Sequence, residues 1–210
     1  MSSNPHIRET PILTQAGAVI LAAGSASRMG SLKQLLPYRS GTLLTHSIEQ
    51  ARQAGFDRIV VVVGAEAERV RISIAALPVE IAVNENWAAG MGSSIAAGVQ
   101  RFRTAGPLPP VLGILLADQP WVSSGHLRAM REQLESTDAA VVAAQYANQL
   151  GAPALFREQL YPLLAGLPPE AGARHLLRGA GVTVSAYPLP EAATDIDTPS
   201  DFAALESMRT

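Results

Sequence analysis

The stretch AVILAAGSASRMGSLK, from Ala18 to Lys33, begins as an apolar run and then turns into small residues that carry two cations, Arg28 and Lys33. A short apolar run closed by glycine is typical of a strand buried on both faces of a sheet. Glycines and small side chains let backbone N–H groups approach phosphate oxygens, and the two cations can neutralise their charge. The stretch therefore predicts a buried strand that is followed either by a phosphate-binding loop or by a solvated loop with exposed cations.

The residues after this stretch repeat a strand–helix–strand rhythm. Apolar residues recur at helical spacing from Leu43 to Ala54, Gly55 supplies a C-terminal stop, and a second apolar run spans Arg58 to Gly64. Short connections between such elements make the two strands parallel. Further helices are expected over 65–77, 94–102, 125–134, 158–164 and 173–178, and further strands over 79–83, 111–117, 139–144 and 182–187.

Two further segments in the C-terminal part of the chain complete this alternation of strands and helices. The segment from Gly151 to Phe156 contains Pro153, which cannot donate to a sheet ladder, so we expect at best an edge strand there. Near the C-terminus, Thr198 and Pro199 predict the start of a last helix. The pattern as a whole predicts an α/β fold: a doubly wound, mostly parallel, Rossmann-like sheet in a single domain over 16–210, preceded by a flexible tail over 1–15.

Composition excludes several classes of function. The chain has 210 residues, of which 48% are apolar and 16% charged, with a net charge of −2, so it lacks the positive footprint of a nucleic-acid-binding protein. The absence of cysteine excludes disulfides, thiolate metal sites and a cysteine nucleophile. No apolar run reaches membrane-spanning length, and the first fifteen residues lack the apolar core of a signal peptide. We expect a cytoplasmic protein with no membrane or nucleic-acid partner.

Carboxylates follow the apolar runs where a ligand would bind. In doubly wound sheets, ligands bind beyond the carboxyl ends of the strands. Asp118 comes directly after the run 111–117 and is either a Mg²⁺ ligand or a turn aspartate, since Mg²⁺ favours few carboxylates together with substrate phosphates. Asp195 and Asp197 have no evident capping role and would complete a Mg²⁺–phosphate site.

A glycine- and serine-rich loop follows the third expected strand. It runs from Asn84 through Trp87 and Gly90 to Ser93 and Ser94, one of which we expect to begin a helix. A helix N-terminus favours anions and leaves free N–H donors. The loop is either a ligand-binding element or a compact loop held by Trp87.

The remaining polar candidates indicate no other catalytic site. The four histidines show no metal-ligand spacing and are expected at the surface; they are His6, His46, His126 and His175. Neither Ser25 nor Ser27 lies in a nucleophile elbow, which argues against a serine hydrolase.

Six sequence motifs occur in order along the chain. The first, Leu21-Ala-Ala-Gly24 with Ser-Arg28-Met-Gly30 and Lys33, resembles the signature loop of the nucleotidyltransferases that act on sugar phosphates and on the molybdenum cofactor. The others are similar to the molybdenum cofactor cytidylyltransferase branch: Asn84-x-x-Trp87-x-x-Gly90-Met-x-Ser-Ser94, Leu116-Ala-Asp118-Gln-Pro120, Gly151-x-Pro-x-Leu-Phe156, Gly172-Ala-Arg174 and Asp195-Ile-Asp-Thr-Pro199. The resemblance covers nearly the whole chain and implies a fold of the nucleotide-diphospho-sugar transferase type.

The resemblance implies a role for each matched residue. Arg28, Lys33 and Asp118 would be catalytic, and Asp118 and Asp197 would hold Mg²⁺. The implied nucleotide-binding residues are Leu21, Ala22, Ala23, Gly24, Ser25, Arg28, Gly30, Lys33, Asn84, Gly90, Ser93 and Ser94. The implied acceptor-binding residues are Gly151, Pro153 and Arg174.

The implied reaction transfers CMP from CTP to molybdopterin and releases pyrophosphate, with a xanthine dehydrogenase-type molybdoenzyme as an implied recipient. Guanylyl-transferring relatives usually carry glycine where Ala23 stands, and a methyl group there would narrow the base pocket in favour of a pyrimidine. The sequence departs from the family pattern at Pro169-Glu170-Ala171 and at Glu85, where the second substrate would bind. The alternatives are a related enzyme that uses GTP or another phosphorylated acceptor, and a non-catalytic carrier of the cofactor.

Overall fold

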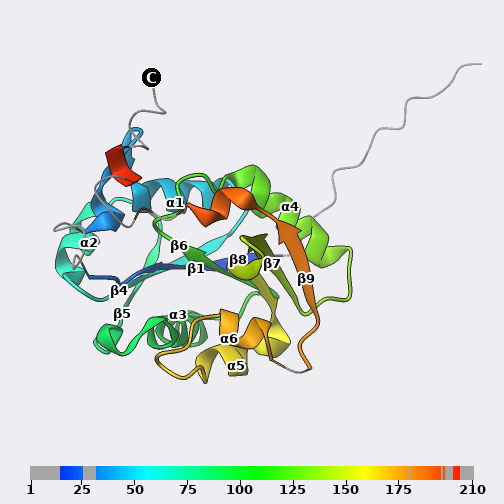
Figure 1. Cartoon of the computed structure of the whole chain (residues 1–210). Coiled ribbons are helices and arrows are strands. Elements are labelled where there is room, and N and C mark those ends of the chain that lie inside the picture. The colour runs from blue at the N-terminus through cyan, green and yellow to red at the C-terminus, as the bar shows by residue number, and fades with distance from the viewer. Residues whose placement is uncertain (1–14, 26–31, 180, 195, 197–200, 204–210) are drawn as a thin grey trace, which may run out of the picture.

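Seven strands form one mixed sheet at the centre of the computed structural model (Figure 1), in the order β5-β4-β1-β6-β8-β7-β9. The structure describes residues 15–25, 32–179, 181–194, 196 and 201–203. The strands are β1 (Ala16–Ala22), β4 (Arg58–Val63), β5 (Glu80–Val83), β6 (Val111–Leu116), β7 (Val141–Tyr146), β8 (Gln149–Arg157) and β9 (Val184–Pro188). A separate hairpin consists of β2 (Pro37–Tyr38) and β3 (Gly41–Thr42).

Helices cover both faces of this sheet, as Figure 1 shows. One face carries α1 (Leu43–Gln53), α2 (Ala67–Ser73) and α4 (Ser124–Glu135), and the other carries α3 (Met91–Ala105), α5 (Tyr161–Ala165) and α6 (Arg174–Leu177). Short 3₁₀ helices occur in the segments between strands and helices: η1 (Lys33–Leu35), η2 (Trp87–Ala89), η3 (Glu158–Leu160) and η4 (Pro190–Ala193). Side chains from the sheet form a separate buried cluster with each helix layer. This arrangement confirms the predicted doubly wound α/β fold.

The strand pairing brings the ends of β1 and β6 together. Strand β1 lies between β4 and β6 and is parallel to both, with Leu21 opposite Val62 on one side and Leu116 on the other. The segments that leave β1 and β6, at Ala23 and Ala117, therefore emerge side by side at the carboxyl edge of the sheet. That edge is where ligands bind in this class of fold.

The segment from Gly151 to Phe156 is an interior strand, so the edge-strand prediction is wrong. It forms most of β8, which is antiparallel to both of its neighbours, β6 and β7. The proline is tolerated because Pro153 precedes the stretch paired with β6, which begins at Ala154, and because the pairing with β7 shifts register between Ala143 and Ala144. A proline at such an irregularity removes no regular ladder bond.

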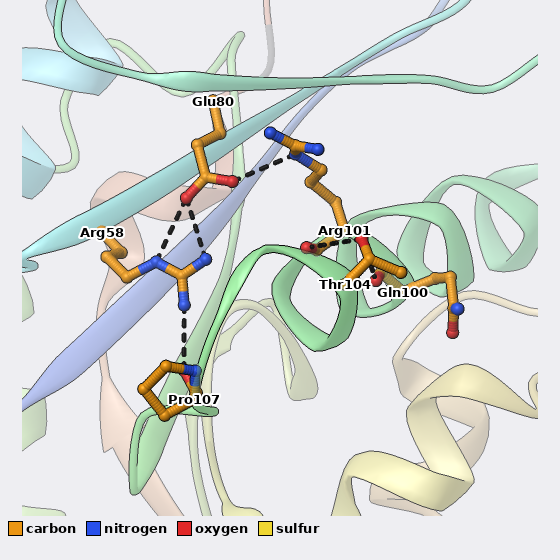
Figure 2. A network of polar contacts seen from close by, with 6 residues as sticks. All are labelled: Arg58, Glu80, Gln100, Arg101, Thr104 and Pro107. Carbon is orange, nitrogen blue, oxygen red and sulfur yellow. Dashed lines mark hydrogen bonds and ion pairs between the residues drawn. The ribbon is translucent and has the colours of Figure 1, made fainter.

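An arginine–glutamate network fastens helix α3 to the amino ends of β4 and β5 (Figure 2). The Arg58 guanidinium donates from Nε and Nη2 to Glu80 Oε1 at 3.1 and 2.9 Å, and from Nη1 to the Pro107 carbonyl at 2.9 Å. Arg101 Nε of α3 lies 3.0 Å from Glu80 Oε2. The Arg58 guanidinium also stacks 4.8 Å from the Phe102 ring centre. These contacts hold the C-terminal half of α3, so that its first turn lies at the carboxyl edge of the sheet.

Several helices differ from the sequence prediction in their bounds; the helix expected over 158–164, for instance, divides into η3 (Glu158–Leu160) and α5 (Tyr161–Ala165). Helix α2 spans Ala67–Ser73 rather than 65–77. Helix α3 begins at Met91, earlier than either Ser93 or Ser94, and Gly90 precedes it with a φ of 128° that favours glycine. The predicted N-terminal tail, but for Gln15, and the predicted helix start at Thr198 lie outside the described residues. No helix in the described ranges is long and apolar enough to cross a membrane.

Candidate active site

A pocket of about 320 Å³ opens at the carboxyl ends of β1 and β6. Its lining comes from the end of β1, the loop at η2, the first turn of α3 and the end of β6. The lining residues are Leu21, Ala23, Gly24, Lys33, Trp87, Gly90, Met91, Ser94, Leu116 and Asp118. Seven of them carry a role implied by the sequence resemblance, and Trp87, Met91 and Leu116 add an apolar wall.

An ion pair connects two of these lining residues, Lys33 and Asp118. Asp118 follows β6 and is buried, while the Lys33 side chain is 26% exposed at the start of η1. The pair brings together a cation from the loop after β1 and a carboxylate from the loop after β6. The pocket can thus offer a positive charge to a phosphate and a carboxylate to a divalent cation.

Gln34 holds the loop after β1 in place, a role that the sequence analysis missed. Its side chain is buried, and Nε2 donates to the carbonyl of Ala22 at 3.1 Å and to that of Gly24 at 3.3 Å. The side chain therefore uses its amide protons to fix the backbone that enters the pocket. Its position beside Lys33 was the available signal, but an amide donor to main-chain carbonyls has no sequence pattern.

Asn84 organises the loop between β5 and α3 from behind the pocket lining. Its Nδ2 donates to Ser93 Oγ and to Ser94 Oγ, both at 2.9 Å, and its Oδ1 accepts from the Asn86 amide at 3.0 Å. Ser93 Oγ in turn donates to the Gly90 carbonyl at 2.7 Å. Asn84 and Ser93 thus shape the loop, whereas Ser94 and Gly90 line the pocket.

The first turn of α3 is packed against the segment at Pro169. The Pro169 carbonyl accepts from the amides of Gly92 at 2.9 Å and Ser93 at 3.4 Å. A Cβ added to Gly90 would lie 2.6 Å from that same carbonyl oxygen, so only glycine permits this approach. The expectation of free N–H donors at this helix start is therefore wrong for Gly92 and Ser93. Pro169 belongs to the departure from the family pattern, and it supports the pocket wall.

Trp87 packs over the ends of β1 and β4. A Cβ added to Gly64 would lie 2.5 Å from Trp87 Cβ and 2.9 Å from Ala23 Cβ. Gly64 thereby lets the indole and the Ala23 methyl approach each other. Both side chains line the pocket that also contains the Lys33–Asp118 pair.

The loop after Asp118 is held by side chains of other elements. The Pro120 carbonyl lies 3.2 Å from His46 Nε2 and accepts from the Tyr38 hydroxyl at 3.5 Å. The Tyr38 and His46 rings meet edge to face at 4.8 Å. His46 is half-buried, so its predicted surface position is wrong; burial, together with the nearby Arg39 cation, lowers its pKa below the ordinary value. His46 is thereby kept neutral, with Nε2 suited to donate to Pro120.

The other two described histidines carry no site role here. His126 is half-buried as well, so its predicted surface position is also wrong; its Nδ1 accepts from the Ser123 amide at 3.3 Å, as part of the cap of α4. His175 is exposed on α6, as predicted. His6 lies outside the described residues.

The residues expected to bind the acceptor lie outside the pocket lining. Gly151 and Pro153 are buried in β8, and Arg174 is exposed at the start of α6. Tyr146 connects two of them, because its hydroxyl accepts from Arg174 Nη2 at 3.4 Å and would lie 2.4 Å from a Cβ added to Gly151.

The other expected site residues divide into two groups. Ala22 is buried and Ser25 is exposed, and neither lines the pocket. Arg28, Gly30, Asp195 and Asp197 lie outside the described residues, although Ile196, which directly precedes Asp197, donates its amide to the Asp118 carbonyl at 3.3 Å. Within the described ranges, no group of three or more histidine, cysteine or acidic side chains gathers as a metal site. A cation at Asp118 would take further ligands from substrate phosphates, which suits Mg²⁺.

A family model described as MobA-like NTP transferase domain matches residues 18–186. The chain belongs to the MobA-like NTP transferase family. The family resemblance inferred from the motifs is thereby confirmed, and the pocket at the ends of β1 and β6 is the candidate active site of a MobA-like nucleotidyltransferase.

Relatives extend the match over almost the full chain. Nicotine blue oxidoreductase of Paenarthrobacter nicotinovorans is 32% identical over 193 residues, which cover 86% of this chain and 91% of the relative. Purine catabolism protein PucB of Bacillus subtilis (strain 168) is 30% identical over 195 residues, covering 88% and 92%. The crystal structure of Rv0371c from Mycobacterium tuberculosis H37Rv superposes with a TM-score of 0.79 at 30% identity, covering 93% of this chain and 98% of that one. The mycobacterial protein has also been crystallised with manganese (TM-score 0.74, 30% identity, covering 91% and 98%), so a divalent metal binds within this family.

Proposed function

We propose that this MobA-like enzyme transfers CMP from CTP to molybdopterin with release of pyrophosphate and with Mg²⁺ as its metal. The observation that carries the proposal is that Lys33 and Asp118 face one pocket beside Gly24, at the strand ends where this fold binds nucleotides. The six ordered motifs support molybdopterin as the acceptor.

The proposed chemistry is a displacement at phosphorus. An oxygen of the terminal phosphate of molybdopterin forms a bond to the α-phosphorus of CTP. The bond from that phosphorus to the oxygen bridging to the β-phosphate breaks, and its electron pair leaves with pyrophosphate. Because the nucleophile is already an anionic phosphate, no strong protein base is needed. This agrees with the absence of histidine from the part of the pocket lining that the structure describes.

The chain's own residues bind and orient the reactants. Lys33 neutralises the triphosphate, and the backbone at Gly24, fixed by Gln34, approaches the phosphates closely. Asp118 holds Mg²⁺, which when bound supplies charge stabilisation at the phosphates. Preorganised charges of this kind contribute roughly 10²–10³ each to the rate.

Ala23 carries the proposed preference for CTP. Its methyl group lines the pocket, and both Ala23 Cβ and Trp87 Cβ lie close to the Gly64 backbone. This group narrows the space for a base and favours a pyrimidine over guanine. In an Ala23→Gly variant, the ratio of kcat/KM for CTP to that for GTP should fall several-fold.

The test is pyrophosphate release from CTP or GTP with Mg²⁺ and molybdopterin, for the wild type, Asp118→Asn and the exposed control Asp57→Asn. Release with CTP that collapses in Asp118→Asn and persists in Asp57→Asn is the expected result. Faster turnover of GTP would contradict the CTP assignment. CTP binding without turnover would contradict molybdopterin as the acceptor.

The relative named nicotine blue oxidoreductase favours a second candidate, because it is 32% identical over 86% of this chain. Oxidoreductase activity would use the same pocket for a nicotinamide nucleotide. The wild type should therefore also be incubated with NADH or NADPH and a quinonoid dye. Steady loss of nicotinamide absorbance, together with no pyrophosphate release from any nucleoside triphosphate, would show that the protein catalyses a redox reaction and not nucleotidyl transfer.

A further inference from the structure

The residue after the pocket aspartate, Gln119, is a buried amide with two long-range partners. Gln119 is 5% exposed, and its Nε2 donates to the Ala152 carbonyl at 3.2 Å and to the Ala192 carbonyl at 2.8 Å. An amide nitrogen carries two protons, so both are used. Neither partner lies near Gln119 in sequence.

One partner belongs to the strand from which the acceptor contacts are expected, and the other to a segment that leads back to Asp118. Ala152 stands in β8 between Gly151 and Pro153, and Pro153 and Gln119 line a common small cavity. Ala192 lies in η4, which leads to Ile196, and the Ile196 amide donates to the Asp118 carbonyl. Gln119 therefore connects the backbone of Asp118 to β8 and to η4 at once.

We propose that Gln119 is a positioning residue that sets β8 and η4 against Asp118, and thereby sets the distance between the two substrates. The inference rests on the proposed nucleotidyl transfer. Nucleotide contacts come from the loops after β1 and β5, which Gln119 does not touch in the described structure, whereas acceptor contacts are expected from β8. Loss of its two hydrogen bonds should therefore affect the acceptor and the rate, and leave nucleotide binding intact. A misplacement of about 1 Å between reacting groups costs roughly 10²-fold in rate.

The substitution Gln119→Met removes both donors while retaining side-chain length. Gln119→Asn is a second variant that keeps an amide but is too short by one methylene to reach both carbonyls. A matched control is Gln133→Met: Gln133 Nε2 also donates twice, to Ser185 Oγ at 2.7 Å and to the Ala186 carbonyl at 3.1 Å, but it holds β9 away from the pocket. Each protein is examined for CTP affinity by calorimetry, for KM and kcat with molybdopterin, and for thermal unfolding.

The expected result is a CTP dissociation constant within about twofold of wild type in both Gln119 variants, with kcat/KM for molybdopterin lowered by roughly 10²-fold. Gln133→Met should retain the wild-type kinetic constants. If the methionine variant does not fold, the asparagine variant carries the test.

Two results would overturn the positioning role while leaving wild-type turnover intact. In one, the Gln119 variants keep wild-type kinetics. In the other, CTP affinity falls in parallel with stability while KM for molybdopterin is unchanged, which is the signature of a purely structural side chain. A wild type that releases no pyrophosphate would instead contradict the proposed function, and the positioning role with it.

Discussion

The ammonium of Lys33 lies against the carboxylate of Asp118, so the two charges that a metal–triphosphate would need are paired with each other. Each member of this pair has a better partner in the proposed complex, the triphosphate for Lys33 and the divalent cation for Asp118. Binding of the metal and of the nucleotide should therefore be coupled. A metal bound to Asp118 frees Lys33 to contact the triphosphate, and a triphosphate bound to Lys33 frees Asp118 to contact the metal.

Replacement of Lys33 by glutamine should separate these two roles. In Lys33→Gln, kcat/KM for CTP should fall by roughly 10²–10³ because a preorganised cation is lost. The nucleotide-free protein should bind Mn²⁺ several-fold more tightly, because Asp118 no longer has an internal cation. Steady-state pyrophosphate release and electron paramagnetic resonance titration measure the two effects.

The control for this pair is Arg103→Gln, which removes an exposed cation of α3. It should change neither quantity. Weaker Mn²⁺ binding in Lys33→Gln would contradict the competition. Lys33 is also the only lysine in the sequence, so reductive methylation yields a single lysine signal whose shift on adding CTP reports the exchange of partners.

Gln34 should be required for both stability and nucleotide affinity. Gln34→Met leaves the carbonyls of Ala22, which is buried, and of Gly24, which is exposed, without their side-chain donor. Loss of the bond to the buried Ala22 carbonyl should lower the free energy of unfolding by about 1–3 kcal/mol. CTP affinity should fall as well, because the backbone at Gly24 is no longer fixed. Urea denaturation and calorimetry measure these effects, and Gln53→Met, at an exposed position of α1, should stay within about 0.5 kcal/mol. Unchanged CTP affinity in a destabilised Gln34→Met variant would show that the loop after β1 does not contribute to nucleotide binding.

A side chain at Gly64 should lower both stability and CTP affinity. In Gly64→Ala the added Cβ would lie 2.5 Å from Trp87 Cβ, so the indole must move, at a cost of about 1–3 kcal/mol in stability. CTP binding should weaken because the apolar wall of the pocket shifts. In the comparison variant Gly125→Ala the nearest atom is 3.6 Å away in the first turn of α4, and stability should rise by up to about 1 kcal/mol. Wild-type CTP affinity in Gly64→Ala would show that Trp87 does not contact the nucleotide.

The parts of the site that could be predicted from sequence are those fixed by strand order. The apolar runs at Ala18 and Val111, together with the rule for parallel sheets, place Gly24 and Asp118 at one edge. The start of α3 could not be predicted, because it depends on the carbonyl of Pro169, a partner distant in sequence. Ser93 has the features of a cap, but its hydroxyl donates to Gly90 instead. Pro153 by itself predicts an edge strand, and the register shift against β7 that accommodates it inside the sheet has no signal in the sequence.

Buried amides escaped prediction for a related reason. Gln34 and Gln119 each donate twice to main-chain carbonyls, and carbonyls are present at every residue. Their partners are therefore set by the tertiary fold and not by a pattern of side chains.

His46 should make the free energy of unfolding depend on pH near neutrality. Its pKa lies below the ordinary value of 6.5 because burial and the neighbouring Arg39 cation disfavour the charged ring, while the Pro120 carbonyl opposes this in part. As the pH decreases, His46 therefore becomes protonated at a higher pH in the unfolded chain than in the folded protein. The free energy of unfolding should fall as the pH decreases from about 7.5 to about 5.5, above the range in which most carboxylates titrate.

The variant His46→Gln should flatten that part of the pH profile, because a glutamine can donate to the Pro120 carbonyl without titrating. Urea denaturation across the pH series measures the slope. His175→Gln, at an exposed position of α6, is the control and should retain the wild-type slope. A slope that persists in His46→Gln would assign the pH dependence to other groups, and the Tyr38–His46 contact would then be a packing feature of the Asp118 loop alone.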